Sequence, residues 1–191
     1  MTRTPTRERL FDAAIELIAE RGFAAASVDR IAERAGVAKG TVYYNFGSKN
    51  ALFTALLEFG VERFGAALRD AADGLPPLDA LSAVVRAELV FIGEHEPFAR
   101  LLLAETWRSG GDWAQAARLI RERAIGAVGD VVRSAVDAGD LRADLDVDTA
   151  ASAVFGMVLM VALDWRTLQP ERPLDEVHAT LMDLLRGRIA T

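Results

Sequence analysis

A short stretch near the amino end gathers side chains that suit contact with nucleic acid. Residues 27–49 read Ser-Val-Asp-Arg-Ile-Ala-Glu-Arg-Ala-Gly-Val-Ala-Lys-Gly-Thr-Val-Tyr-Tyr-Asn-Phe-Gly-Ser-Lys, and they include both lysines of the chain, Lys39 and Lys49. Lysine neutralises phosphates, whereas threonine, tyrosine and asparagine can form hydrogen bonds with phosphates and base edges. The residue types therefore indicate binding rather than bond-making chemistry.

The apolar residues of this stretch have the spacing of a helix-turn-helix. Ser27 can cap a short helix at 28–35, and Gly36 suits the left-handed backbone that ends it. A second short helix is expected at about 39–46, packed on the first. The apolar positions that this pattern buries are Val28, Ile31, Ala32, Ala35, Val37, Val42 and Phe46.

The second short helix leaves polar and aromatic side chains on its outer side or at its amino end, where they can reach base edges and phosphates. Taken alone, the tyrosines could be core aromatics, the Thr-Val-Tyr-Tyr run has strand propensity, and the lysines could be ordinary solvated charges. The complete helix-turn-helix spacing favours DNA binding. The exposed positions are Lys39, Thr41, Tyr43, Tyr44 and Asn45.

Helical periodicity continues through the rest of the chain, without a convincing run of alternating strand pattern. Prolines and glycines punctuate it, beginning with a helix start at Thr4-Pro5. We expect an all-α fold of about nine helices, with a three-helix domain at 1–48 and a larger helical domain at 49–191. The expected helices span about 5–22, 28–35, 39–46, 48–73, 78–94, 97–109, 112–138, 147–168 and 174–187.

Charge is distributed unevenly along the 191 residues. The net charge is -6, but residues 1–50 carry 8 Lys and Arg against 6 Asp and Glu, whereas residues 51–191 carry 14 against 22. Overall acidity argues against a nonspecific polyanion binder, yet the basic part coincides with the helix-turn-helix. The chain has no cysteine, which excludes disulfides and thiolate metal sites and agrees with a reducing cytoplasm.

We expect neither a secretion signal nor a membrane span. Asp12, Glu16 and Glu20 interrupt the segment behind the basic amino end, and the longest uncharged stretch, 149–163, is shorter than the roughly 20 residues that a bilayer requires. That stretch is apolar on nearly all sides and predicts a buried helix.

Residues 27–49 resemble the DNA-binding domain of the TetR family of transcriptional regulators. The shared pattern is Ile-Ala-x-x-Ala-Gly-Val, then Lys-Gly-x-hydrophobic-Tyr-Tyr, then Phe and a Lys three residues on. It covers about the first quarter of the chain, and the length and helix order match the family's nine-helix plan over the remainder. The resemblance implies an N-terminal DNA-binding domain followed by a ligand-binding and dimerisation domain.

The resemblance implies a role for each exposed residue of the motif. Ser27, where the family usually has Thr, and Lys49 would contact phosphates. Asn45, where the family more often has His, would contact a phosphate or an adenine, and Ala38 replaces a Ser that commonly binds phosphate. The implied DNA-binding set is Ser27, Lys39, Gly40, Thr41, Tyr43, Tyr44, Asn45 and Lys49.

A homodimer is expected for two reasons. One short helix reads only a few base pairs, so two-fold duplication is the usual physical solution. The family also builds a four-helix dimer bundle from its last two long helices, which correspond here to about 147–168 and 174–187. The alternative is that 149–163 is the central core helix of a monomer.

The resemblance also implies an effector pocket formed by the middle helices, for a small apolar molecule. Helically spaced aromatics are more often packing residues, and His95 near a helix end could be a solvated or capping residue, so a structural role for each stays open. The candidate pocket residues are Phe91, His95, Phe98, Leu102, Glu105, Trp107, Trp113, Ile120 and Met157.

The expected function is a repressor that binds a palindromic operator and releases it when the effector binds. An activator, or a ligand-binding regulator without DNA affinity, is an alternative, and an enzyme is a more distant one, because His95 and His178 lie far apart and no nucleophile or phosphate-loop pattern is present. We expect no metal and no cofactor. Asp144, Asp146 and Asp148 lack the glycine and glutamate of a calcium loop and favour a helix start instead.

Two glycines inside the long helix at 48–73 call for an explanation. Gly60 and Gly65 each cost about 1 kcal/mol relative to alanine in a helix interior. They could soften the helix as a hinge, but we expect them to permit close packing of a neighbouring element.

Overall fold

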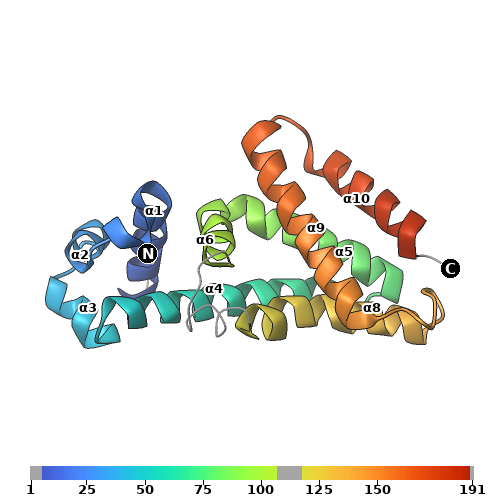
Figure 1. Cartoon of the computed structure of the whole chain (residues 1–191), viewed down its shortest axis with the longest axis horizontal. Helices are drawn as coiled ribbons and strands as arrows, with labels where there is room; N and C mark the ends of the chain where they lie inside the picture. Colours follow the sequence, from blue (N-terminus) through green and yellow to red (C-terminus); the bar gives the residue numbers. More distant parts are fainter. Residues whose placement is uncertain (1–5, 107–117, 190–191) are drawn as a thin grey trace. The chain divides into compact units, whose positions relative to one another are not determined.

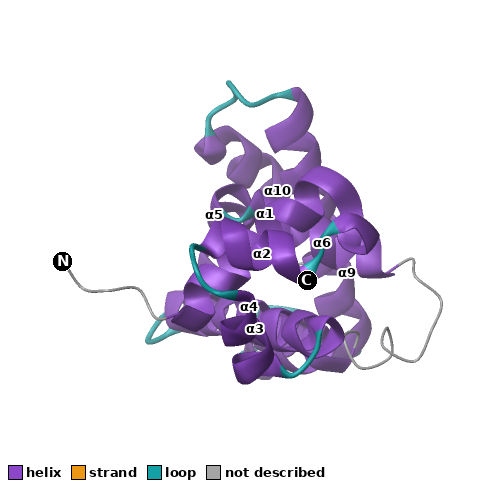
Figure 2. Cartoon of the chain, turned by 90° about the vertical axis from the view of Figure 1, so that its left-hand side faces the viewer, coloured by secondary structure: helices purple, strands orange, loops and turns teal. Residues whose placement is uncertain are grey.

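The computed structural model describes residues 6–106 and 118–189, which form helices joined by short loops, without a strand in that part of the chain (Figure 2). This confirms the all-α prediction. The helices are α1 (Thr6–Ala25), α2 (Val28–Ala35), α3 (Lys39–Phe46), α4 (Lys49–Ala72), α5 (Pro77–Glu94), α6 (Glu96–Thr106), a π-helical turn η1 (Arg121–Ile125), α8 (Gly126–Asp137), α9 (Val147–Leu168) and α10 (Leu174–Ile189) (Figure 1).

The chain divides into two compact units. Unit 1 comprises residues 1–60 with 97–116, and unit 2 comprises 61–96 with 117–191. The division falls inside α4, so this one continuous helix belongs to both units. The domain boundary after residue 48 that the sequence suggests stays a prediction.

Unit 1 is built around the buried faces of its first four helices. Phe11 on α1 lies in ring contact with Phe46, at 5.5 Å between centroids, and with Phe59 on α4, at 5.1 Å. Gly22 interrupts α1 with φ 77°, as predicted, but one further turn follows it to Ala25. The core of these helices consists of Leu10, Phe11, Ala14, Leu17, Ile18, Val28, Ile31, Ala32, Ala35, Val42, Leu52 and Leu56.

The turn between α2 and α3 forms as the sequence predicts. Ser27 caps α2, its Oγ accepting a hydrogen bond from the Arg30 amide, and Gly36 ends α2 in the left-handed region at φ 63°. The Val37 amide then donates to the Ala32 carbonyl at 2.9 Å, closing a C-terminal cap that directs the chain into α3.

Two arginines fix α1 to this turn. Arg9 on α1 donates through Nη2 to the carbonyl oxygens of Ala35 and, at 3.2 Å, of Gly36. Arg34 on α2 forms a bidentate ion pair with Glu20 on α1, in which Nη1 donates to Oε1 at 2.6 Å and Nη2 donates to Oε2 at 3.0 Å. Since Arg9 occupies carbonyls at the negative end of α2, it supplies the positive charge that this end favours.

Both glycines inside α4 serve close packing. A Cβ atom at Gly60 would lie 2.2 Å from the ring of Phe98 on α6, and a Cβ at Gly65 would lie 2.5 Å from the carbonyl oxygen of Arg123 in η1. No side chain larger than hydrogen fits at these distances without movement. The packing explanation is therefore confirmed over the hinge.

Unit 2 places α5, α8 and α9 against one another, with α10 on α5 and α9 (Figure 1). His178 on α10 donates through Nε2 to the Ser82 carbonyl at 2.9 Å, and Arg86 on α5 pairs with Asp175. The predicted long helix at 112–138 contains the π-helical turn η1, and its residues up to 117 lie outside the described part.

The helix α9 begins at the acid-rich loop. Asp146 caps it by accepting a hydrogen bond from the Thr149 amide at 2.8 Å, which holds the pKa of this carboxyl below its usual value. By length and composition, α9 alone among the helices of the described part could span a bilayer, with a mean hydropathy of 1.6. It packs against α5 and α8, but only 39% of its apolar window is buried, so the helix predicted to be buried has an exposed side.

We predict that Gly65→Ala destabilises the protein by about 1–3 kcal/mol, because backbone would have to shift to admit the methyl group. This loss should exceed the roughly 1 kcal/mol that alanine gains in a helix interior. Urea unfolding measures the difference. Gly129→Ala, on the buried face of α8, is the matched control. Its methyl group would lie at an ordinary distance of 3.6 Å from the Cβ of Ala151 on α9. Equal or higher stability of both variants would contradict the close contact.

Candidate functional site

The helix α3 presents its polar face to solvent. Tyr44 is 91% exposed and Tyr43 46% exposed, so neither is a core residue, and both lie on a helix rather than on a strand. Lys39 and Gly40 are also exposed, Thr41 is half-buried, and Val42 faces the core. Of the five positions predicted to be exposed, Lys39, Tyr43 and Tyr44 are exposed, whereas Thr41 and Asn45 are half-buried.

Two of the candidate side chains on α3 have partners within unit 1. The Lys39 ammonium lies 2.8 Å from a carboxylate oxygen of Asp29 on α2, and this pairing raises the pKa of Lys39. Asn45 donates through Nδ2 to the Thr41 carbonyl at 2.7 Å, which turns its amide toward its own helix. Ser27 stands exposed at the start of α2, and Lys49 is half-buried at the start of α4.

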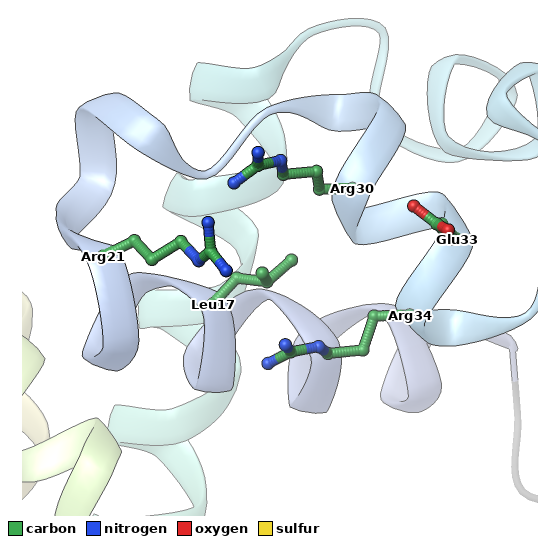
Figure 3. Close-up of a pocket in the computed structure, with 5 residues that line it drawn as sticks. All are labelled: Leu17, Arg21, Arg30, Glu33 and Arg34. Atoms are coloured by element: carbon green, nitrogen blue, oxygen red, sulfur yellow. The ribbon is translucent and has the colours of Figure 1, made fainter.

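A basic surface hollow lies between α1 and α2, lined by Leu17, Arg21, Arg30, Glu33 and Arg34. Figure 3 shows Arg21 from α1 and Arg30 from α2 extending over it. Arg34 is engaged by Glu20, an ion pair that lowers the pKa of the glutamate. The sequence does not reveal this hollow, because its cations come from two helices and Arg21 precedes Arg30 by nine residues.

Unit 2 contains a stack of three rings. Phe91 on α5 lies between Phe64 on α4 and His95, with centroid distances of 4.4 Å on both sides and interplanar angles of 13° and 8°. His95 ends α5, its amide and its Nδ1 both directed to the Phe91 carbonyl. Phe155 on α9 contacts Phe64 at 5.8 Å, so the stack borders the packed centre of this unit.

Glu88 lies one turn before Phe91 on the buried side of α5. Its side chain is fully buried, and neither carboxyl oxygen has a hydrogen-bond partner in the described residues. Burial raises the pKa of Glu88 well above its ordinary value, because an apolar surrounding disfavours the charged form. The sequence carried a signal for it: a single acid replaces an apolar residue in the run Leu81, Val84, Val85, Glu88, Leu89 and Ile92.

The structure divides the predicted pocket residues between the two units. Phe91, His95, Ile120 and Met157 belong to unit 2, and buried Phe98 and Leu102 belong to unit 1. Trp107, Trp113 and the side chain of Glu105 lie outside the described residues. The helix-end position expected of His95 is confirmed, with its ring also stacked on Phe91.

The last two helices keep large apolar side chains on the surface of the chain. Met160 is 54% exposed and Leu168 70% exposed on α9, while Leu184 is 42% exposed on α10. The opposite side of α9 is buried, including Val154, Val158 and Ala162. A helix that is apolar on its exposed side as well indicates a contact surface.

The family model described as "Bacterial regulatory proteins, tetR family" matches residues 10–56, which include α2, α3 and the start of α4. The chain belongs to the TetR family. It is a ligand-responsive transcriptional regulator with the N-terminal helix-turn-helix and the C-terminal helical region of that family. Its TetR-family relatives are named as regulators rather than as enzymes.

Three relatives match this TetR-family chain over most of its length. The fatty acid metabolism regulator protein of Bacillus subtilis is 23% identical over 184 residues, covering 96% of this chain and 95% of the relative. The transcriptional activator FasR of Mycolicibacterium smegmatis is 29% identical and covers 94% and 80%. The crystal structure of FadR from Bacillus subtilis in complex with stearoyl-CoA has the same fold, with a TM-score of 0.81, 23% identity and coverage of 93% and 96%.

We predict that Glu88 makes the protein less stable as the pH rises. Its folded pKa is raised, so above the ordinary glutamate pKa of about 4.3 the folded state keeps a proton that the unfolded chain releases. The free energy of unfolding then falls with pH until Glu88 ionises in the folded state. Glu88→Gln has no proton to lose, so the variant should gain stability relative to wild type as pH rises.

Urea unfolding across this range measures that difference, and Glu94→Gln, an exposed acid at the end of the same helix, is the control. Parallel stability curves for wild type and Glu88→Gln would show that Glu88 does not titrate from a buried, neutral state.

Proposed function

We propose that the protein represses transcription by binding a palindromic operator as a homodimer in the bacterial cytoplasm, and that an effector with a long apolar chain releases it. The observation that carries the proposal is α3, whose side chains Lys39, Tyr43 and Tyr44 are exposed beside the capped start of α2. Tyr44, 91% exposed, has almost no packing role, and the exposed parts of both tyrosines suit contacts with phosphates and bases in a major groove.

Each proposed DNA contact has a place on this surface. Lys39, Gly40 and Thr41 form the amino end of α3 and would enter the groove first, followed by Tyr43 and Tyr44. Asn45 would have to exchange its bond to the Thr41 carbonyl for a DNA contact. Ser27 and Lys49, at the starts of α2 and α4, would hold phosphates on either side.

The homodimer would use α9 and α10. Their exposed Met160, Leu168 and Leu184 supply the apolar surface that a stable interface requires, and the four helices of two protomers would enclose it. A dimer that reads a palindromic operator would have to present its two copies of α3 to successive major grooves, which lie about 34 Å apart.

The effector proposal rests on the aromatic stack of unit 2 and on the relatives. The stack of Phe64, Phe91 and His95 suits an apolar chain, and a structural relative binds stearoyl-CoA. Arg69 on α4 and Arg123 in η1 converge on Glu62, at 3.2 and 3.1 Å, which leaves an excess of one positive charge near this unit's surface. That excess suits an anionic head group, so we propose a long-chain acyl-CoA.

Activation rather than repression is the second candidate, because the relative FasR is named as an activator and covers nearly the whole chain. The two functions share the DNA surface and the effector, and differ in where the operator lies relative to the promoter. Transcription of a reporter with and without the protein separates them.

We predict that Tyr43→Ala and Lys49→Ala each weaken binding to DNA from upstream of the protein's own gene by about tenfold. Lys49→Ala should also reduce the slope of log affinity against log salt by about 2, because the dimer loses two phosphate contacts. Mobility-shift titrations at several salt concentrations measure both effects. Stearoyl-CoA added to the wild-type complex should release the DNA.

Asp29→Asn provides the matched change in the opposite direction. It removes the anion that holds Lys39 at 2.8 Å, so DNA affinity should rise several-fold and the salt dependence should become steeper. Asp70→Asn, an exposed acid on α4 away from this surface, should leave both unchanged. If the three single variants Tyr43→Ala, Lys49→Ala and Asp29→Asn all bound DNA with the affinity of the wild type, the proposed DNA-binding surface would be refuted.

We predict that Met160→Glu with Leu184→Glu converts the dimer to monomers at micromolar concentration, because four buried charges would enter its apolar centre. Sedimentation velocity measures the mass, and operator affinity should fall in parallel. Leu78→Glu, at an exposed leucine on α5, is the control and should remain a dimer. A dimeric double variant would place the interface elsewhere.

A further inference from the structure

Two side chains of unit 2 have buried polar atoms without a hydrogen-bond partner in the described residues, Arg166 at Nε and Glu88 at both carboxyl oxygens, and of these only Glu88 is buried as a whole. Its two carboxyl oxygens are inaccessible to solvent and lack hydrogen-bond partners in the described residues, and no ion pair in that part of the chain reaches it. A buried polar group left without a partner is destabilising, so such a residue is a candidate to bind a partner from outside the chain.

The position of Glu88 directs it toward the apolar centre of unit 2. Residues three and seven positions later on a helix lie on the same face, and here these are Phe91 and His95 of the ring stack. The α10 contacts of α5, through Ser82 and Arg86, lie on a different face. Seven residues of helix correspond to about 10 Å, so Glu88 lies roughly that far along α5 from the half-buried imidazole.

We propose that the carboxylic acid of Glu88 is a specificity-determining residue of the effector site, and that it donates a hydrogen bond to an uncharged oxygen on the apolar part of the effector. This inference rests on the proposed function, since it names the group by which the acyl-CoA is recognised. In the fully buried surroundings of Glu88, a neutral acid can donate to a carbonyl or hydroxyl oxygen, whereas an ionised one could not.

The chemistry narrows the choice of effector group. A phosphate or carboxylate would need a cation beside it. Arg69 and Arg123 are exposed on the surface, and Arg166 on α9 lies against α5 at Gly93, five residues beyond Glu88, without an ion pair to Glu88 in the described residues. An uncharged oxygen needs only the donor. Two sources supply one: the thioester carbonyl of an acyl-CoA, or a hydroxyl carried along its chain.

The test compares ligands that differ by that single oxygen. Calorimetry with the full-length protein would measure the affinities for stearoyl-CoA, for S-octadecyl-CoA, which lacks the thioester carbonyl, and for 3-hydroxystearoyl-CoA and 10-hydroxystearoyl-CoA. The pairs compared are stearoyl-CoA with S-octadecyl-CoA, and each hydroxystearoyl-CoA with stearoyl-CoA. We expect wild type to bind the ligand with the additional oxygen about tenfold more tightly in one of these pairs. The pair that shows the preference identifies the source of the oxygen.

Variants of Glu88 then show whether the acid causes the preference. Glu88→Gln keeps an N–H donor and should keep the preference, whereas Glu88→Met has no donor and should reduce it to about one. Glu94→Gln, at an exposed acid of the same helix, should behave as wild type. Glu88→Met should fold at least as stably as wild type, because it replaces an unpaired buried acid with an apolar side chain of similar size.

Operator binding without ligand and the melting temperature check that each variant is folded. Preference retained by Glu88→Met, or equal wild-type affinity within every pair, would overturn the role of Glu88 while leaving an acyl-CoA effector intact. If wild type binds none of the four ligands, the proposed effector class fails, and this inference fails with it.

Discussion

Close approach of other elements to the backbone of α4 is the constraint on which both units depend. At Gly60 the ring of Phe98 occupies the space of a side chain, and at Gly65 the carbonyl of Arg123 does so. Two glycines five positions apart on a single helix therefore carry one tight contact in each unit. A helix normally avoids glycine because of its entropic cost, and here the packing offsets that cost. The π-helical turn η1 lies at the second contact, so a local departure from α-helical geometry occurs beside a close approach of two backbones.

The two units differ in the kind of surface that they provide. In unit 1, ion pairs and carbonyl contacts of Arg9 and Arg34 hold α1 to the turn, and the polar face of α3 stays open to solvent. In unit 2, the centre is apolar and aromatic, and Glu88 is the polar exception. The two units thus depend on different physical interactions, polar contacts at the surface of unit 1 and apolar packing in the centre of unit 2, and α4 contributes residues to both.

Helices, caps and turns could be predicted from local sequence because their causes are local. Ser27, Gly36 and Asp146 act on residues within four positions, and the structure confirms all three. Gly22 was expected to end the first helix, and its non-helical backbone breaks the helix there, although a short helical stretch follows it to Ala25. The Lys39–Asp29 pair, the ring stack and the hollow of Figure 3 join side chains from different helices or turns, and periodicity along one helix does not encode such meetings. Glu88 was visible as an acid in an apolar run, yet its isolation depends on what surrounds α5.

The exposure of Tyr44 has a consequence for how this protein can diverge. Gly36 and the buried residues of α2 and α3 are fixed by backbone geometry and packing, so their replacement would cost stability. Tyr44, 91% exposed, contributes almost nothing to that frame. Substitutions there leave the fold unchanged. Under the proposed DNA contact, duplicated copies of such a gene can therefore acquire new target sequences without first passing through an unstable protein.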